Sequence, residues 1–506
     1  MSSENNGYLS TLASKHGFSN NHEKLDDIEF LQIRYTDVPG RFLACYLLKG
    51  DNNIEDLFRD GIGLDGSSVR GFADINESDL ILLPDRSTIR IISTTTTIPS
   101  HNIATAIANV YKGFGQGRLT KDPRHVSQCL EGYLRENGLS CQIGAEVECF
   151  IFDDIIFQNN NDQDGKTRRH SYRPKVISVE QYGTGKYPIR RRGGYDAPPF
   201  QDSLTEFRFE VAEILKKCYS IKVTNLIHEV ASNGQIEINF MHSSLTKAAD
   251  NVQMYKDVVR NVAKKCNKVA NFMPKPIFDD ENDNGSSSGD NGSGMHTSVS
   301  LWDSATNNKP THNIFYDEND DYAELSQAAR YFIGGILEHA HSLAAFVTPT
   351  VNSYYRMVPG FEAPVYIAWA RGNRSAVIRV PVDTKKSFKS KRIEFRAPDP
   401  SANPYLAFSA IVSAGLDGIK RKTDPGSSVD ENIYKMSDSK RNSLGIKSLP
   451  GSLEESLEVL GSDSNYLKTC FNSELVETYS MLKKEEIIQV GKDKSKPRQF
   501  MFYYDV

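Results

Sequence analysis

Two glutamates separated by one residue, Glu146 and Glu148, lie in the apolar run GAEVECFIFDD. This run predicts a β-strand, in which alternate side chains share a face, so both carboxylates point the same way about 7 Å apart. An isolated pair of this kind is usually a strand face in contact with water. The pair indicates metal chemistry only if other strands bring further acids to it.

A second pair of glutamates favours a cation. The run LIHEVASNGQIEINF predicts a β-hairpin, and a three-residue turn at 232–234 would set Glu229 opposite Glu237. Facing carboxylates repel each other and need water or a cation between them. A third strand, SKRIEFRAPD, adds Glu394 on a face that it shares with Arg392 and Arg396. Metal explains so many acids among apolar residues better than solvent does.

The expected cation is magnesium or manganese. His296 follows the glycine-rich turn DNGSGM. A single histidine is usually structural, but the five glutamates make this one a candidate sixth ligand. Oxygen ligands with one imidazole suit Mg²⁺ or Mn²⁺, whereas zinc prefers sulfur and nitrogen.

Basic side chains gather within about forty residues of one another, near the end of the acidic region. They are Arg356, Arg374, Arg379, Lys389, Arg392 and Arg396. Carboxylates that hold metal, beside guanidinium groups, are what phosphoryl transfer requires, because negative charge builds on the phosphoryl oxygens. Surface salt bridges are the alternative, but they do not explain arginines that alternate with apolar residues in strands. The sequence has no G-x-x-x-x-G-K-[ST] loop, so a nucleotide must be held differently.

The elements that position these residues are mixed strands and helices. We expect two strands within 28–48, a helix that begins at Asp122-Pro123, a long helix over about 323–346, and another that begins at Asn403-Pro404. The elements do not alternate regularly, which favours an α+β fold over a doubly wound one. A chain of 506 residues is too long for one core, so we expect at least two domains.

Composition narrows the classes of partner. The formal net charge of -5 leaves no basic field for nucleic acid or an anionic membrane. The seven cysteines include no C-x-x-C pair, which favours a reducing compartment. The N-terminal residues show no signal peptide, and no apolar run is long enough to span a bilayer. We therefore expect a cytoplasmic protein with small-molecule ligands.

Several motifs, in this order, resemble class I glutamine synthetases of the β-type. They are LDGSS with NESDLILLPD, NFMPKPIF, DNGSGMH followed by SLW, NSYYRMVPGFEAP, RGNRSAVIRVP and RIEFRAPDPSANPYLAFSA. The resemblance implies a polar lead-in over 1–24, a β-grasp domain over 25–118, and a larger catalytic domain over 119–506 with a curved antiparallel sheet flanked by helices. It also implies a dodecamer of two stacked hexameric rings, with each active site between neighbouring subunits.

The resemblance assigns roles residue by residue. Glu148, Glu229 and Glu237 would hold the metal nearer glutamate, and Glu146, His296 and Glu394 the metal nearer the nucleotide. Arg356, Arg396, Asn291 and Gly292 would bind glutamate. Arg374, Arg379, Lys389 and Arg392 would face the phosphates, with Ser300 near the nucleotide. Asp65, with Ser68 and Tyr195 nearby, would bind and help to deprotonate ammonium, and Glu362 would shield the intermediate and accept a proton.

The implied activity is ATP-dependent ligation of ammonia to L-glutamate through a γ-glutamyl phosphate. Two alternatives remain open: a γ-glutamyl ligase for a polyamine or another amine, and an inactive structural homologue. Tyr434 stands where some β-type enzymes are adenylylated, but Lys435 and Ser437 differ from the usual neighbours, so an ordinary surface tyrosine is the favoured interpretation. An insert at 279–289 precedes the DNGSGMH motif and imitates a calcium loop without its final glutamate.

Overall fold

The computed structural model describes most of the chain. The described ranges are 28–50, 54–92, 101–113, 115–160, 171–277, 290–304, 311–358, 363–382, 387–491 and 496–506. The side chains of 158–160, 171–173 and 496–497 are left out of the description. The predicted lead-in, the insert at 279–289 and Glu362 lie outside the described residues.

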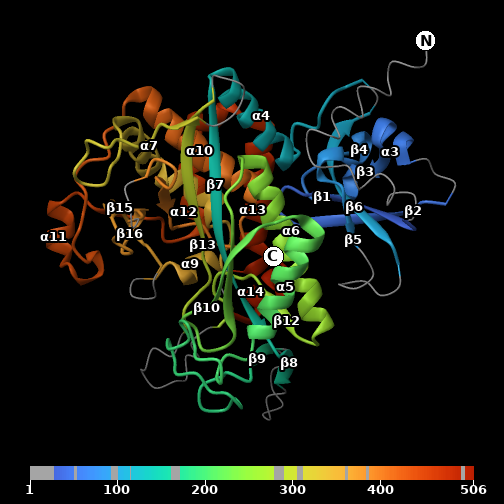
Figure 1. Cartoon of the computed structure of the whole chain (residues 1–506), viewed down its shortest axis with the longest axis horizontal. Helices are drawn as coiled ribbons and strands as arrows, with labels where there is room; N and C mark the ends of the chain where they lie inside the picture. The colour runs from blue at the N-terminus through green and yellow to red at the C-terminus, as the bar shows by residue number, and fades with distance from the viewer. Residues whose placement is uncertain are drawn as a thin grey trace.

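The N-terminal part of the described chain forms a sheet of six strands, drawn in blue at one side of the molecule (Figure 1). Its order is β2-β1-β6-β4-β3, with β5 beside β6. The strands are β1 (Phe30–Thr36), β2 (Phe42–Leu48), β3 (Ile62–Asp65), β4 (Asp79–Pro84), β5 (Arg90–Ile92) and β6 (Ile103–Lys112), and helix α3 (Ile54–Asp60) packs on β4. The first two strands confirm the prediction for 28–48.

The second sheet, of ten described strands, runs through the larger body. Its order is β10-β11-β7-β13-β17-β16-β15-β18, with β12 beside β7 and β14 beside β13. The strands are β7 (Leu139–Phe152), β10 (Val223–His228), β11 (Gln235–Phe240), β12 (Val269–Asn271), β13 (Met295–Asp303), β14 (His312–Asn313), β15 (Tyr366–Arg371), β16 (Ala376–Val380), β17 (Ile393–Phe395) and β18 (Lys447–Ser448). The pairing is antiparallel, as expected, except between β15 and β16. A separate hairpin joins β8 (Asp154–Asn160) to β9 (Ser171–Ile177).

The larger body also contains helices, some of which cover one face of its sheet. They are α4 (Pro123–Glu136), α5 (Thr205–Tyr219), α6 (Leu245–Lys265), α7 (Gln327–Glu338), α8 (Ala340–Val347), α9 (Ser353–Arg356), α10 (Pro404–Arg421), α11 (Asp438–Ser443), α12 (Leu453–Ser462), α13 (Ser473–Val490) and α14 (Lys496–Tyr503). Helices α4 and α6 pack on β7, and α10 packs on both of them. The odd-numbered side chains of β7 from 141 to 149 are buried, which leaves its even-numbered glutamates on the opposite face.

Two of the predicted helix starts are confirmed. The Asp122 side chain accepts a hydrogen bond from the Arg124 amide at the start of α4, and the Asn403 side chain accepts one from the Tyr405 amide at the start of α10. The long helix expected over 323–346 is wrong as a single element. It is broken into α7 and α8 at His339.

Buried ion pairs join the two sheets. Arg34 of β1 pairs with Asp257 of α6 at 2.9 Å. Arg124 of α4 pairs with Asp85 at 2.9 Å and with Asp250 of α6 at 3.0 Å, and it donates to Asn109 of β6. A buried charge needs its partner at hydrogen-bonding distance, and these pairs are satisfied in only one arrangement of the small sheet on helices α4 and α6. They therefore fix how the small sheet lies against the helices. Among the described residues, no helix has the length and apolarity to cross a bilayer.

Candidate active site

A cavity of about 1130 Å³ opens on the face of the large sheet that the helices leave free. Five of the six predicted metal ligands line it: Glu146, Glu148, Glu229, Glu237 and His296. They come from β7, β11, β13 and the residue after β10, segments far apart in the sequence. The sheet therefore gathers the predicted acids in one place.

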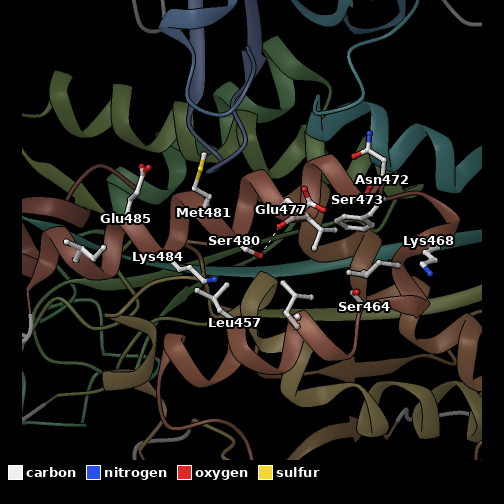
Figure 2. Close-up of a pocket in the computed structure, with 16 residues that line it drawn as sticks. Leu457, Ser464, Lys468, Asn472, Ser473, Glu477, Ser480, Met481, Lys484 and Glu485 are labelled. Carbon is white, nitrogen blue, oxygen red and sulfur yellow. Dashed lines mark hydrogen bonds between the residues drawn. The ribbon is translucent and has the colours of Figure 1, made fainter. Parts of the chain in front are cut away.

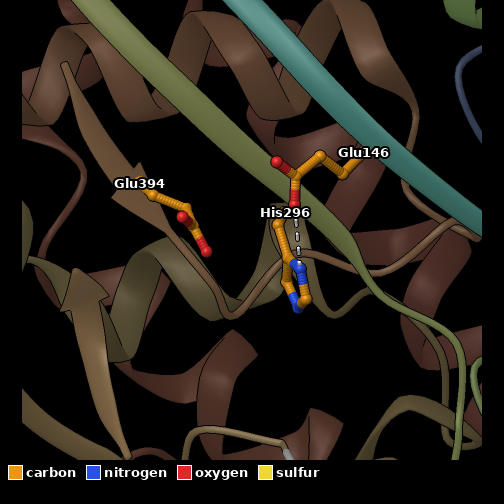
Figure 3. Close-up of side chains that lie close together, drawn as sticks. All are labelled: Glu146, His296 and Glu394. Carbon is orange, nitrogen blue, oxygen red and sulfur yellow. Dashed lines mark ion pairs between the residues drawn. The ribbon is translucent and has the colours of Figure 1, made fainter. Parts of the chain in front are cut away.

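Glu146, His296 and Glu394 form the tightest group. Each offers a ligand atom, and these atoms lie within 4.8 Å of one another. Glu146 faces His296 across the β7–β13 ladder, with a carboxylate oxygen 3.5 Å from Nδ1, and Glu394 points toward them from β17 (Figure 3). Burial and the charge of Arg396 hold the pKa of His296 well below its usual range, so its imidazole is neutral and free to bind a metal.

The second group is Glu148, Glu229 and Glu237. Glu237 lies directly opposite Glu148 in the β11–β7 ladder, and burial followed by the charge of Glu148 raises the pKa of Glu237. Burial and the charge of Glu229 likewise raise the pKa of Glu148. Buried carboxyls that raise each other's pKa values ionise together only when a cation lies beside them, so this group suits a metal.

The predicted register of the hairpin is wrong. Glu237 faces Ile227, and the amide of Glu229 donates to the carbonyl of Gln235 at 2.9 Å. The turn therefore spans 230–234 rather than 232–234, although Gly234 does take the expected left-handed conformation with a φ of 80°. The amide of Ala231 donates to the Gln235 side chain, which closes this longer turn. The facing carboxylates are those of Glu237 and Glu148.

Two side chains that we did not predict orient these acids. The Gln235 amide donates to Glu148 at 3.0 Å and to the Gly292 carbonyl at 3.0 Å. The Asn239 amide donates to Glu237 at 2.7 Å, and its own buried oxygen has no partner among the described residues. An unpaired buried acceptor beside acids suits the water shell of a cation. The period-two spacing of Gln235, Glu237 and Asn239 is the sequence signal that could have revealed them.

Buried arginines border the acids. Arg396 pairs with Glu394 at 2.6 Å, and Arg379 pairs with the other oxygen of the same carboxylate. Arg356 is 3% exposed and donates to the carbonyls of Ala397 and Arg396 at 2.8 and 3.2 Å. Arg356, Arg374 and Arg396 line the cavity. The cavity therefore combines acids for cations with cations for anionic groups.

The remaining predicted residues fall in three places. Asn291, Gly292 and Tyr195 line the cavity. Arg379, Lys389, Arg392, Ser300 and Glu394 are absent from its described lining, although Glu394 pairs with Arg396, which lines it, and Arg379 pairs with Glu394. Asp65 and Ser68 lie on the small sheet, where Asp65 accepts from Ser67 and Ser68, and they do not line the cavity within one chain.

Tyr434 is placed differently from the surface tyrosine that we favoured. It is half-buried at the cavity, and its hydroxyl donates to the Ala363 carbonyl at 2.9 Å. Arg192, Asn225, Asn373, Asp430 and Asn432 also line the cavity and were not predicted. They belong mostly to loops, whose side-chain directions follow no period.

A second cavity, of about 590 Å³, lies between α12 and α13 (Figure 2). Its described lining includes Leu457, Leu460, Phe471 and Val476, with Lys484 and Glu485 at one end. None of the predicted site residues lines it. The chemistry therefore belongs to the first cavity.

Together, the two sheets and the cavity bring acids that suit divalent cations next to basic groups that suit an anionic substrate, which is the arrangement of a metal-dependent enzyme. The family described as "Glutamine synthetase, beta-Grasp domain" matches residues 27–113, and that described as "Glutamine synthetase, catalytic domain" matches 120–503. The chain belongs to the glutamine synthetase family, whose activity is glutamate–ammonia ligation. The match confirms the predicted fold class, with its N-terminal β-grasp domain.

Relatives that match almost the full length of the chain support the same family. A glutamine synthetase of Sulfolobus acidocaldarius is 44% identical over 474 residues, which cover 92% of this chain and 95% of that protein. One of Frankia alni is 37% identical over 499 residues, or 95% and 97% of the two chains. The solved structure of Plasmodium falciparum glutamine synthetase matches with a TM-score of 0.76 at 26% identity, and covers 94% of this chain and 95% of that one.

Proposed function

We propose that this cavity joins ammonia to the side-chain carboxylate of L-glutamate at the expense of ATP. The observation that carries the proposal is the convergence of both carboxylate groups on one cavity beside Arg356 and Arg396. Other chemistry of anionic substrates would not require two clusters of acids in or beside one cavity. The domain limits at 118 and 119 belong to the same proposal and fall between β6 and α4.

The acids would form two metal sites. Glu146, His296 and Glu394 would hold one Mg²⁺ or Mn²⁺, and Glu148, Glu229 and Glu237 a second. When bound, the cations would neutralise the phosphate oxygens and lower their repulsion of the glutamate carboxylate. Gln235 and Asn239 would keep Glu148 and Glu237 turned toward the second site.

The basic and amide groups would place the two substrates. Arg356, Arg396, Asn291 and Gly292 would bind the glutamate backbone groups. Arg374, Arg379, Lys389 and Arg392 would face the phosphates, with Ser300 near the nucleotide. A γ-carboxylate oxygen then attacks the γ-phosphorus of ATP, and ADP leaves. The acyl phosphate that results is a much better electrophile than the carboxylate.

Ammonia would attack from a subsite shared by two subunits. Asp65 from a neighbour would bind ammonium there, with Ser68 and Tyr195 nearby, and help to remove a proton from it. The nitrogen attacks the carbonyl carbon, inorganic phosphate leaves, and Glu362 accepts a further proton. The exposure of Asp65 on the small sheet supports its use in trans, in a dodecamer of two hexameric rings. The seven free cysteines, all among the described residues, support a cytoplasmic location.

The test compares amines in one assay. Phosphate release and glutamine formation are measured with ATP, glutamate and Mg²⁺, with ammonium or with a panel that includes ethanolamine and polyamines. We expect both products with ammonium and little turnover with the larger amines. Turnover only with a larger amine would favour the alternative ligase, and none with any amine would favour an inactive homologue.

Glu362→Ala tests the guard role. We expect ATP and glutamate still to bind, while glutamine formation falls by about 100-fold because the intermediate loses its shield and its proton acceptor. Substrate binding by calorimetry separates this from a folding defect. Glutamine synthesis near the unaltered level would refute the role.

A further inference from the structure

The segment between β9 and α5, residues 178–204, is held together by one buried carboxylate. Glu180 is 0% exposed, and its Oε1 accepts from the amide and hydroxyl of Ser203 at 2.8 and 2.7 Å. The Glu180 carbonyl also accepts from the Ile189 amide at 3.0 Å. Both ends of the segment therefore meet at Glu180, although the segment contains no helix or strand.

The other oxygen of Glu180 connects the segment to the active-site strand. Oε2 lies 3.0 Å from Nε2 of His228, the last residue of β10, which is 2% exposed. Nδ1 of the same ring lies 2.8 Å from the carbonyl oxygen of Glu229. Because a carboxylate and a carbonyl only accept, both ring nitrogens donate, and His228 ties Glu180 to the backbone of Glu229.

The segment then touches that strand end on both sides of Tyr195. The Gly194 amide donates to the Val230 carbonyl at 3.1 Å, and the Asp196 amide donates to the His228 carbonyl at 3.1 Å. A Cβ at Gly194 would lie 2.4 Å from the Glu229 carbonyl oxygen and 2.8 Å from Cε1 of His228. Only glycine allows this approach, and it brings Tyr195 to the part of the cavity that Glu229 lines, close enough for burial and the charge of Glu229 to raise the pKa of Tyr195.

Glu180, His228 and Asp202 lie close enough to suggest a metal site, but their atoms are already used. Asp202 accepts from the Leu204 amide at 3.0 Å and pairs with Arg208, and Glu180 accepts from Ser203 and His228. Both ring nitrogens of His228 already donate, so the imidazole has no lone pair to offer a cation. The cluster is therefore a structural anchor.

We propose that the Glu180–His228 pair is a positioning device for the amine subsite, which holds Tyr195 at a set distance from Glu229. The inference rests on the proposed function, because it assigns both residues to the subsite where ammonium binds. The pair touches no substrate itself. It sets the affinity for the amine and leaves the nucleotide end of the cavity, at Glu146 and Glu394, unaffected.

The test measures steady-state constants for His228→Asn and Glu180→Gln. The asparagine keeps a donor near the Glu229 carbonyl but does not reach Glu180, and the glutamine removes the charge at nearly constant shape. We expect the KM for ammonium to rise by about tenfold, as for other residues that orient a ligand, with the KM for ATP within about twofold. Gly194→Ala should give the same pattern by pushing Tyr195 outward, and it decides the case if His228→Asn does not fold.

His339→Asn is the matched control. His339 is also a buried histidine between acidic partners, Asp417 and Asp463, but it does not line the cavity. We expect this variant to lower the Tm and leave the KM for ammonium unchanged. If His228→Asn and Gly194→Ala behave in the same way, the pair is only structural and the inference is wrong. Absence of glutamine formation by the unaltered protein would instead overturn the proposed function.

Discussion

At the scale of residues, the molecule concentrates negative charge where folding alone would disfavour it. Five carboxylates and one neutral imidazole meet in or beside one cavity, and Glu148 is 7% exposed. The free energy needed to bury several like charges together exceeds the stabilisation from any one of their hydrogen bonds. The protein without its cations should therefore carry a stability penalty that depends on pH.

This penalty predicts how stability changes with pH. Burial and neighbouring acids raise the pKa of Glu148 and of Glu237, whereas an unfolded glutamate ionises near 4.5. The stability contributed by the protonated carboxyls is present below that value and is lost as pH rises through the raised pKa values. After treatment with a chelator, the Tm should fall as the pH rises from about 4.5 to about 8. Added Mg²⁺ should raise the Tm more at the higher pH.

The double variant Glu148→Gln, Glu237→Gln provides the control, because it removes both titrating groups at nearly constant shape. Its Tm should depend less on pH and respond less to Mg²⁺. Equal stabilisation of the unaltered protein by Mg²⁺ at both pH values would contradict the proposed second metal site.

At the scale of elements, the break between α7 and α8 shows how one side chain overrides helix propensity. His339 donates from both ring nitrogens, to Asp463 at 2.9 Å and to Asp417 of α10 at 3.0 Å, and stacks on Tyr466 with ring centroids 4.2 Å apart. These contacts join the α7–α8 junction to α10 and to the residue after α12. Apolar periodicity over 323–346 contains no sign of them, so the sequence predicts a single helix.

His339 should stabilise the packing of these helices to an extent that depends on pH. Burial opposes its charge, but its hydrogen bonds to Asp463 and Asp417 prevail and raise its pKa above 6.5. The stability it contributes is therefore present below pH 6.5 and lost as pH rises through the raised value. His339→Asn should cost about 3 kcal/mol at about pH 6 and less at higher pH, measured by urea denaturation. A cost independent of pH would show that packing on Tyr466, not the charge, provides the stability.

At the scale of the whole molecule, one chain holds an incomplete set of the proposed catalytic groups. The described residues that line the cavity all come from 146–434, whereas Asp65 lies on the small sheet. Buried pairs such as Arg34–Asp257 and Arg124–Asp250 fix that sheet against the helices. Asp65 therefore reaches a cavity only if a neighbour presents one.

Mixed assemblies test this arrangement. Asp65→Ala and Glu229→Ala should each be nearly inactive, but coexpression at equal amounts should restore about one quarter of the unaltered activity, because one in four shared sites then has both residues. Mixing Glu229→Ala with Glu394→Ala is the control. Both changes fall in the same chain's site, so the activity should not recover. No recovery in the first mixture would refute the shared site, and light scattering gives the size of the assembly.

Local spacing in the sequence determined which residue types share a face. The alternation of β7 placed Glu146 and Glu148 together, and the caps at Asp122 and Asn403 marked two helix starts, because these features depend only on neighbours within a few residues. The motifs indicated the family and, through the family, the fold. Spacing and motifs together therefore predicted six candidate metal ligands as a set, and five of them line one cavity.

Only the tertiary structure decided which strands and loops meet. A turn two residues longer than expected set Glu237 opposite Ile227 instead of Glu229, and the pairing of β11 with β7 set it opposite Glu148. A fully buried carboxylate, Glu180, linked a loop to β10 across 48 positions. Such contacts depend on long-range closure and on which partner satisfies a buried charge, and short-range periodicity contains neither. For this reason the sequence predicted the residue types of the candidate site, whereas it predicted neither the register of the hairpin nor the contacts that hold the neighbouring loop.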